Sequence, residues 1–314
     1  MKWAFAPAVL ALACASAPES TVRVTVPRGA TLVAVADTLE ARGVIRSPDI
    51  FRFYSRLTGR QRFIRAGTYD FPAEASARRA LRILLHGRVA ERRVVLPEGL
   101  MLTEVAELIR DHLGVPADSF RAAARDLGLL AEFGIPAPNA EGYLYPSTYL
   151  VPVGATARDV VRQQLSEFRS RWRPSWDLRL DSLRISRHQA VVLASIIEGE
   201  VRYGPDRPYV SSVYHNRLRR GMRLQADPTV IYALGRRRRL FERDYRLVSP
   251  HNTYLIDGLP PGPIGQPSAE SIEAALYPVK TAFLYLVARS DGKHVFSRTF
   301  REHLRATAEV REDR

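Results

Sequence analysis

Glu198 lies near the end of the stretch of this sequence that is best suited to acid–base chemistry. The stretch from Ser186 to Glu200 reads SRHQAVVLASIIEGE. Ser186 with Gln189 three residues later is a capping-box pattern, which predicts that a helix begins there. Residues 190–197 are apolar except for Ser195, so this helix is expected to be buried. The apolar part is far too short to cross a membrane.

A carboxyl group on such a helix could act as a general acid. At helical spacing Glu198 shares a face with Val191, Ala194 and Ser195, whereas Glu200 points about 200° away around the helix. Partial desolvation favours the protonated form of a carboxyl group, and that form can donate a proton to a leaving oxygen. The alternative is that Glu198 only ends the helix and points into water, which is the commoner outcome for an arbitrary Glu in this position.

Polar residues that could bind a ligand follow this helix. Gln225, Asp227 and Thr229 are gathered in a turn around Pro228, and the segment 249–254 (SPHNTY) is a second polar and aromatic loop. Asp227 could equally cap the helix that is predicted to begin there. A ligand-binding role and a capping role for Asp227 are therefore both open.

Helices and short strands must position these groups, and we expect an α+β fold. Alternating or periodic apolar residues predict strands at 21–26, 67–71, 285–288 and 294–297 and helices at 32–42, 48–57, 75–85, 118–133, 155–172, 186–200, 209–218, 229–234 and 269–276. The second of these helices is expected to turn Ile50, Phe51, Tyr54 and Leu57 inward. Residues 258–267 are too rich in Pro and Gly for regular structure and could form a rigid wall of a cleft.

A strand, a Pro-x-Gly turn and an amphipathic helix occur twice, starting near Val26 and again near Leu96. This unit is common, so the echo is only weak evidence of duplication. It does predict a domain boundary near residues 87–93. A chain of 314 residues is long enough for two or more domains.

The chain is globular in composition and strongly basic, with 46% hydrophobic residues and a net charge of +14 that comes almost entirely from Arg. Such a charge suits nucleic acid, an acidic membrane surface or an anionic polymer. The basic residues are spread along the chain, apart from the run Arg236 to Arg239, which we expect in a solvated loop. No zinc-ligand array or RNA-binding signature accompanies them, so nucleic acid is not expected as a partner.

The first twenty residues have the layout of an export signal, which predicts a protein that works outside the cytoplasm. An apolar stretch from Trp3 to Ala13 is followed by Cys14 and small residues. Cys14 could be a lipoprotein processing site, and Ala15-Ser16-Ala17 would suit signal peptidase. A lasting spanning helix is a third alternative, which Pro7 and the short length disfavour. Cys14 is the only cysteine, so the chain has no internal disulfide and no cysteine-based metal site.

Five motifs together resemble the YceG-like family of endolytic murein transglycosylases. They are EGYLYPSTY (141–149), LASIIEGE (193–200), SSVYHNRLRRGMRLQADPTVIYALG (211–235), NTYLIDGLPPGPIGQPS (252–268) and LYLVARSDGKHVFS (284–297). The likeness runs from about Val22 to His303. Two positions depart from it, because Gly199 replaces a Lys that is often found there and Ser147 stands where Asp is usual.

The resemblance implies an anchor segment at 1–20, a LysM-like module at 21–90 and a catalytic domain at 91–314. It also implies cleavage of the β-1,4 bond between N-acetylmuramic acid and N-acetylglucosamine in nascent glycan strands. The product would carry a 1,6-anhydro end, and strand elongation in cell-wall synthesis would stop there. The implied place of work is the outer face of the cytoplasmic membrane, with peptidoglycan synthases as candidate partners. The alternative is a scaffold protein that binds peptidoglycan and does not cleave it.

The catalytic Glu of the family falls on Glu198. Candidate substrate-binding residues are Glu141, Asn216, Arg217, Gln225, Asp227, Thr229, Asn252 and Tyr254. Hydrolases that cleave sugars usually need two carboxyl groups. A lytic transglycosylase can use one, because the 6-hydroxyl of the sugar is the attacking group. No metal or cofactor is expected.

Overall fold

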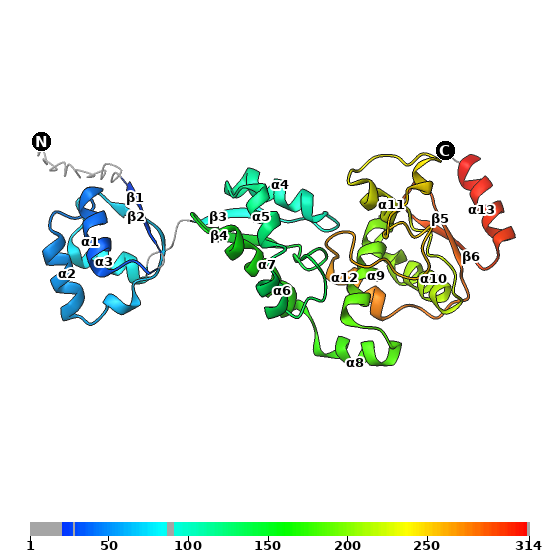
Figure 1. The fold of residues 1–314 in the computed structure, drawn as a ribbon, viewed down its shortest axis with the longest axis horizontal. Coiled ribbons are helices and arrows are strands. Elements are labelled where there is room, and N and C mark those ends of the chain that lie inside the picture. The colour runs from blue at the N-terminus through cyan, green and yellow to red at the C-terminus, as the bar shows by residue number, and fades with distance from the viewer. Residues whose placement is uncertain (1–20, 28, 87–90, 313–314) are drawn as a thin grey trace, which may run out of the picture. The chain divides into compact units, whose positions relative to one another are not determined.

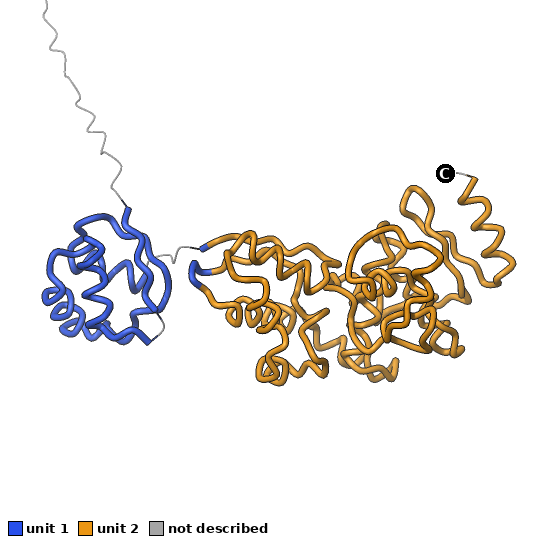
Figure 2. Tube along the Cα trace, turned by 45° about the horizontal axis from the view of Figure 1, so that its top comes forward, with its two compact units in different colours: residues 1–91, 152–154 blue, residues 92–151, 155–314 orange. Residues whose placement is uncertain are grey.

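The computed structural model of the chain describes residues 21–27, 29–86 and 91–312. The predicted export signal at 1–20 lies outside the described residues. The chain divides into two compact units, residues 1–91 with 152–154 (unit 1) and residues 92–151 with 155–314 (unit 2), shown in Figure 2. Helices and short strands are mixed in the chain, so the α+β prediction is confirmed. Within the described ranges no helix has the length and apolar character needed to span a bilayer.

Unit 1 is a two-stranded antiparallel sheet with helices packed against it. Its elements are β1 (Thr21–Val26), α1 (Leu32–Ala41), α2 (Pro48–Leu57), the short 3₁₀ helix η1 (Gln61–Phe63), β2 (Gly67–Pro72) and α3 (Ala77–His86). Val24 pairs with Tyr69 across the sheet. A separate core forms around Leu39, Phe51 and Phe71, all fully buried. Unit 1 therefore has the interior of an independent module.

Helix α2 differs from the prediction in the side that it buries. Phe51 and Ser55 are fully buried, whereas Ile50 and Leu57 are 61% and 70% exposed. Residues 50 and 57 lie two turns apart on one side of the helix, and Phe51 lies about 100° further around. The inward assignment of Ile50 and Leu57 was wrong because apolar character alone does not say which of two apolar stripes meets the core.

The remaining elements follow in the order β3 (Glu91–Val95), α4 (Leu102–Leu113), α5 (Ala117–Ala123), α6 (Leu127–Glu132), β4 (Thr148–Pro152), α7 (Ala157–Arg171), α8 (Pro174–Leu183), α9 (Arg187–Glu200), η2 (Gly204–Asp206), α10 (Arg207–Arg219), α11 (Asp227–Leu234), η3 (Asp244–Arg246), α12 (Ala269–Leu276), β5 (Tyr285–Ala288), β6 (His294–Ser297) and α13 (Phe300–Glu312) (Figure 1). Strand β3 pairs with β4, and β5 pairs with β6 in antiparallel register.

The helix predicted at 118–133 is two helices. Helix α5 ends at Ala123 with Ala124 as its C-cap, and Asp126, the N-cap of α6, accepts a hydrogen bond from the backbone N–H of Leu129 (2.8 Å). The freed carbonyl of Ala124 accepts from the N–H of Ala140 (2.8 Å). Asp is a preferred N-cap residue, so Asp126 is the signal in the sequence that marks the start of a second helix.

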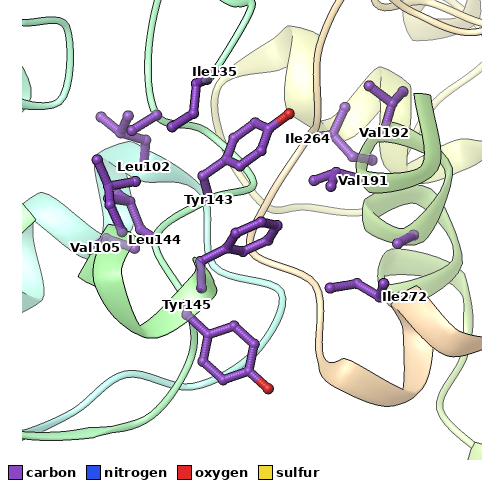
Figure 3. Packing of buried hydrophobic residues seen from close by; sticks show 14 of the residues in the cluster. Leu102, Val105, Ile135, Tyr143, Leu144, Tyr145, Val191, Val192, Ile264 and Ile272 are labelled. Carbon is purple, nitrogen blue, oxygen red and sulfur yellow. The ribbon is translucent and has the colours of Figure 1, made fainter. Parts of the chain in front are cut away.

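Helix α9 lies at the centre of unit 2 and packs against α8, α10, α11 and α12. It begins with the predicted capping box of Ser186 and Gln189, and every residue from 190 to 197 is buried. In Figure 3, Tyr143 and Tyr145 lie between residues of α4 and the side of α9 that carries Val191. The prediction of a buried central helix is confirmed.

Gly142 lets the loop 141–149 approach α9 closely. Its φ is +82°, a backbone conformation that favours glycine. A Cβ there would lie 2.4 Å from Cβ of Pro263 and 3.1 Å from Cγ1 of Val191. The loop, the Pro-rich coil and the central helix are therefore in direct contact at this point.

Candidate active site

The carboxyl group of Glu198 is held near the end of α9 by three donors. The backbone N–H of Ser268 donates to its Oε2 (2.9 Å), and so does the Ser268 hydroxyl. Arg207 approaches the other oxygen, Oε1, at 3.4 Å. The Glu198 side chain is only 9% exposed. Sequence reasoning missed both Ser268 and Arg207, because each is brought to Glu198 by tertiary structure alone.

Helix ends explain why these donors converge. Ser268 is the N-cap of α12, and its hydroxyl also accepts from the N–H of Ser271 (3.2 Å). The positive end of the α12 dipole therefore faces Glu198. Arg207 is the first residue of α10, and its Nε donates to the Ser271 hydroxyl (3.1 Å). The arrangement stabilises negative charge on Oε2, while Oε1 keeps only the long contact to Arg207.

The Pro-rich coil is fixed to the central helix beside Glu198. The Ser195 hydroxyl, one helical turn before Glu198, accepts from the N–H of Ile264 (3.0 Å). The backbone of Gln266 exchanges hydrogen bonds with Gly99 and Leu100 (2.7 and 2.9 Å). A Cβ on Gly99 would lie 3.7 Å from Cγ of Glu198. The coil and the turn at residue 99 therefore both border the catalytic candidate.

The run Arg236 to Arg239 forms a loop, as predicted, and three of its four arginines are exposed. Arg237 also anchors the turn at Gly99. It donates to the carbonyl oxygen of Gly99 (2.5 Å) and to both oxygens of Glu104 (2.7 and 2.9 Å). Arg238 pairs with Asp244 at 2.6 Å. Two of the four arginines thus hold loops in place.

Glu200 lies in a different environment from Glu198, as helical geometry predicts. The Tyr214 hydroxyl donates to its Oε1 (2.8 Å). Burial raises the pKa of Glu200 to about 7, against the effect of the Tyr214 hydrogen bond, and the nearby charge of Asp227 raises it further. Near neutral pH the Glu200 carboxyl therefore holds a proton for part of the time.

Asp227 is the first residue of α11, and its side chain does not cap the helix. Its carboxylate instead accepts from the hydroxyls of Tyr254 (2.6 Å) and Tyr245 (3.4 Å). Asp227 is exposed, and so is Gln225, whose backbone has a positive φ of 47°. The capping alternative for Asp227 is wrong, and the turn presents polar groups to solvent.

This turn lies against the catalytic end of α9. A Cβ on Gly199 would be 2.7 Å from Cβ of Pro228, the second residue of α11. The start of α11 therefore packs directly on the helical turn that carries Glu198 and Glu200. A lysine at position 199 would not fit this contact without a shift of α11.

The other five candidates are buried, and their polar groups bond within the protein. Asn216 donates to the carbonyls of Thr281 and Phe283, Arg217 to those of Leu284 and Leu224, and Asn252 to those of Tyr245 and Leu247, while Thr229 bonds Ala226 and Thr253. Glu141 is the fifth. Substrate contact by these residues stays a prediction, and their visible role is to hold loops around the site.

Glu141 is a buried acid that joins three segments. It accepts from the N–H of Leu102 (2.9 and 3.0 Å) at the start of α4 and from the side-chain amide of Gln266 (2.6 Å). Gln266 in turn accepts from the N–H of Leu144 (3.0 Å). Burial raises the pKa of Glu141 to about 8, although these hydrogen bonds oppose the rise. The residue therefore stays largely protonated at neutral pH.

This raised pKa predicts that unit 2 loses stability as the pH rises. Unfolded Glu has a pKa near 4.3, so between pH 5.5 and 7.5 the folded state holds a proton that the unfolded state has released. Stability should fall by about 2 kcal/mol over this interval from Glu141 alone. Calorimetric unfolding at the two pH values measures the fall.

The Glu141→Gln variant is the control for this dependence. Its amide imitates the protonated acid and keeps an oxygen for Leu102 and Gln266, so the fall with pH should be smaller by about that amount. An unchanged pH dependence in Glu141→Gln would contradict the assignment.

The described part of the chain contains no group of three or more His, Cys, Asp or Glu side chains that could hold a metal ion. The donors of Ser268 and Arg207 converge on one carboxyl group, that of Glu198. Such a group can give and take a proton at a substrate oxygen.

The fold is shared with a solved structure. A YceG-like protein from Listeria monocytogenes is 31% identical with a TM-score of 0.64, over 92% of this chain and 99% of that chain. The endolytic murein transglycosylase of Bacillus subtilis strain 168 is 31% identical over 305 residues, which are 92% of this chain and 84% of the relative. That of Streptococcus pneumoniae strain D39 is 27% identical over 321 residues, and the match spans 58% of the relative.

Residues 24–309 match the YceG-like family. The chain belongs to this family, which confirms the resemblance that its motifs indicated.

Proposed function

We propose that this chain is an endolytic murein transglycosylase with Glu198 as its catalytic residue. The observation that carries the proposal is the position of the Glu198 carboxyl, which lies near the end of the buried helix α9 and faces Ser268 and Arg207. The family membership and the name of the Bacillus subtilis relative support the same activity. The family and the name of this relative do not favour the alternative of a non-catalytic scaffold.

The reaction needs only one carboxyl group. Glu198 donates its proton to the oxygen that leaves C1 of N-acetylmuramic acid, and the glycosidic bond breaks. Glu198 then accepts the proton of the sugar's own 6-hydroxyl as that oxygen bonds to C1, which closes the 1,6-anhydro ring. Ser268 and Arg207 stabilise the negative charge that develops on Glu198 when it gives up its proton.

Neither of the two neighbouring carboxyl groups is arranged to activate water at the same place. Glu200 bonds the Tyr214 hydroxyl, and Asp227 bonds the hydroxyls of two tyrosines. An inverting or retaining hydrolase would require a second carboxyl group across the scissile bond from the first. Internal attack by the 6-hydroxyl fits the geometry better.

The exposed turn at the start of α11 is the proposed sugar-binding surface. Gln225 and Asp227 face solvent there, and Tyr254 adds a half-buried ring with a polar tip. Amide, carboxylate and phenol groups suit sugar hydroxyls and acetamido groups. Glu141, Asn216, Arg217, Thr229 and Asn252 would act by shaping the loops.

Product analysis tests the proposed activity. Murein incubated with the purified protein should release fragments that end in 1,6-anhydro-N-acetylmuramic acid, identified by mass, and internal bonds should be cut. Fragments with reducing ends would show a hydrolase instead. Binding of glycan without any product would favour a scaffold.

The Ser268→Ala variant should cleave murein roughly tenfold more slowly, because one donor to the Glu198 carboxylate is lost. Loss of the N-cap alone also costs about 1 kcal/mol of stability. Thr156→Ala removes the N-cap hydroxyl of α7 and is the matched control. If the control slowed cleavage equally, Ser268 would have no special role.

We propose further that unit 1 is a LysM-like module that positions unit 2 and does no chemistry. Its own sheet and core support a separate module. The apolar segment at 1–20 would hold the protein at the outer face of the cytoplasmic membrane, where murein strands are made and where peptidoglycan synthases would be its partners. Recovery of the native protein in the cytoplasmic fraction of lysed cells would contradict this location.

A further inference from the structure

The outer face of α2 in unit 1 carries an apolar stripe that no described residue covers. Ile50, Phe53 and Leu57 are 61%, 68% and 70% exposed, and their spacing of three and four residues puts them on one side of the helix. Phe63 in η1, which follows α2 after a short turn, is also mostly exposed. Four large apolar side chains are therefore exposed within residues 50–63, which is an unusual number for so short a segment.

The same segment is strongly basic. Between residues 50 and 69 the sequence has five arginines and no Asp or Glu. Arg52 pairs with Asp49 and Asp37. The other four, Arg56, Arg60, Arg62 and Arg65, are exposed and pair with no acidic residue of the described chain. We call these four arginines and the four apolar residues the α2 surface.

An open hollow of about 580 Å³ borders four residues of the α2 surface, Arg60, Arg62, Phe63 and Arg65. It is lined by Arg60, Arg62, Phe63, Ile64, Arg65, Leu85 and His86. The Arg62 guanidinium lies over the Phe63 ring, 5.0 Å from its centroid. One guanidinium group can donate two parallel hydrogen bonds to a phosphate, and three arginines line this hollow. The hollow therefore suits a ligand that has a phosphate group next to an apolar part.

We propose that the α2 surface binds a bilayer that contains anionic phospholipid. Phe53, Leu57 and their apolar neighbours enter the interfacial layer, and the arginines bind lipid phosphates. Charge complementarity selects this partner, because the four arginines of the surface have no acidic partner among the described residues, and the neighbouring Asp49 is already paired with Arg52. The aliphatic Ile50 and Leu57 side chains offer no hydrogen bonds to the hydroxyls of a glycan strand or to a nucleic acid backbone, so a bilayer is the better fit.

This second contact would give unit 1 a defined face toward the membrane, in addition to any attachment through residues 1–20. It does not rest on the proposed enzymatic function, because vesicle binding is measured without murein. The two proposals can therefore fail separately.

Co-sedimentation with vesicles tests the proposal on a protein that begins at Thr21, which keeps both units and both buried clusters. Binding should be seen with vesicles of phosphatidylcholine and phosphatidylglycerol and should weaken with salt. The protein should bind vesicles of phosphatidylcholine alone more weakly, by roughly tenfold or more. Equal binding to both vesicle types would overturn the proposal.

Two variants locate the contact. The triple change Arg60→Gln, Arg62→Gln and Arg65→Gln should weaken binding roughly tenfold or more. The double change Phe53→Ser and Leu57→Ser should weaken it by a similar factor. All five side chains are exposed, so the fold should be unaffected, which circular dichroism checks.

Matched changes on unit 2 are the controls. Arg301→Gln, Arg305→Gln and Arg311→Gln remove the same charge from exposed positions of α13, and Leu127→Ser with Leu178→Ser removes exposed apolar groups. These proteins should bind like the parent. An equal loss of vesicle binding in the controls would show that the attraction is not specific to the α2 surface. If the α2 variants lost binding to glycan but kept binding to vesicles, the surface would be a glycan-binding one. Either result would overturn the proposal.

Discussion

Replacing Glu198 by Gln should slow murein cleavage by roughly a hundredfold or more while the protein stays folded. The amide has the size and shape of the acid but no transferable proton. Its oxygen can still accept from the N–H and hydroxyl of Ser268, as the Oε2 of Glu198 does. Kinetics of anhydro-end release, together with the unfolding temperature of the variant, measure the two expectations.

Glu200→Gln is the matched control for this change. It makes the same chemical substitution two residues away on the same helix, where the side chain bonds Tyr214. Burial already raises the pKa of Glu200 to about 7, so the neutral amide resembles a form that the native residue adopts. Cleavage should change far less than in Glu198→Gln. A Glu198→Gln protein that kept its activity would remove the proposed mechanism.

Local sequence signals were sufficient to predict the element that carries the catalytic candidate. The capping box at Ser186 and the run of apolar residues predicted a buried helix, and helical spacing separated Glu198 from Glu200. Both expectations depend only on residues within one helix. The structure agrees with them because a strong cap and an all-round apolar surface leave few alternative conformations and positions.

The surroundings of Glu198 could not be predicted in the same way. Ser268 was identified only as the start of a helix, and nothing in its neighbourhood indicates that its hydroxyl faces a residue seventy positions earlier. Asp227 has the residue type of a cap, yet two tyrosine hydroxyls bind its carboxylate. Helix α2 has two apolar stripes, and the choice between them depends on where the sheet of unit 1 lies. Contacts of this kind are decided by tertiary packing.

Gly142→Ala should destabilise unit 2 by about 3 kcal/mol or more, the largest stability effect that we expect from adding one methyl group. The residue has a positive φ, which costs an L-residue about 1 kcal/mol. The new methyl would also overlap Pro263, at 2.4 Å from its Cβ. Because Pro263 belongs to the coil that leads to Ser268, its displacement should slow cleavage as well. Calorimetry and the murein assay measure the two effects.

Gly134→Ala separates backbone strain from overlap. Gly134 has a φ of +65°, and a Cβ there would meet nothing within 4 Å. Its replacement should therefore cost only the strain of the left-handed conformation, about 1 kcal/mol. The difference between the two variants measures the contact of Gly142 with Pro263 and Val191. Equal losses of stability would mean that the coil moves away freely, and the loop 141–149 would then have no part in holding Ser268 against Glu198.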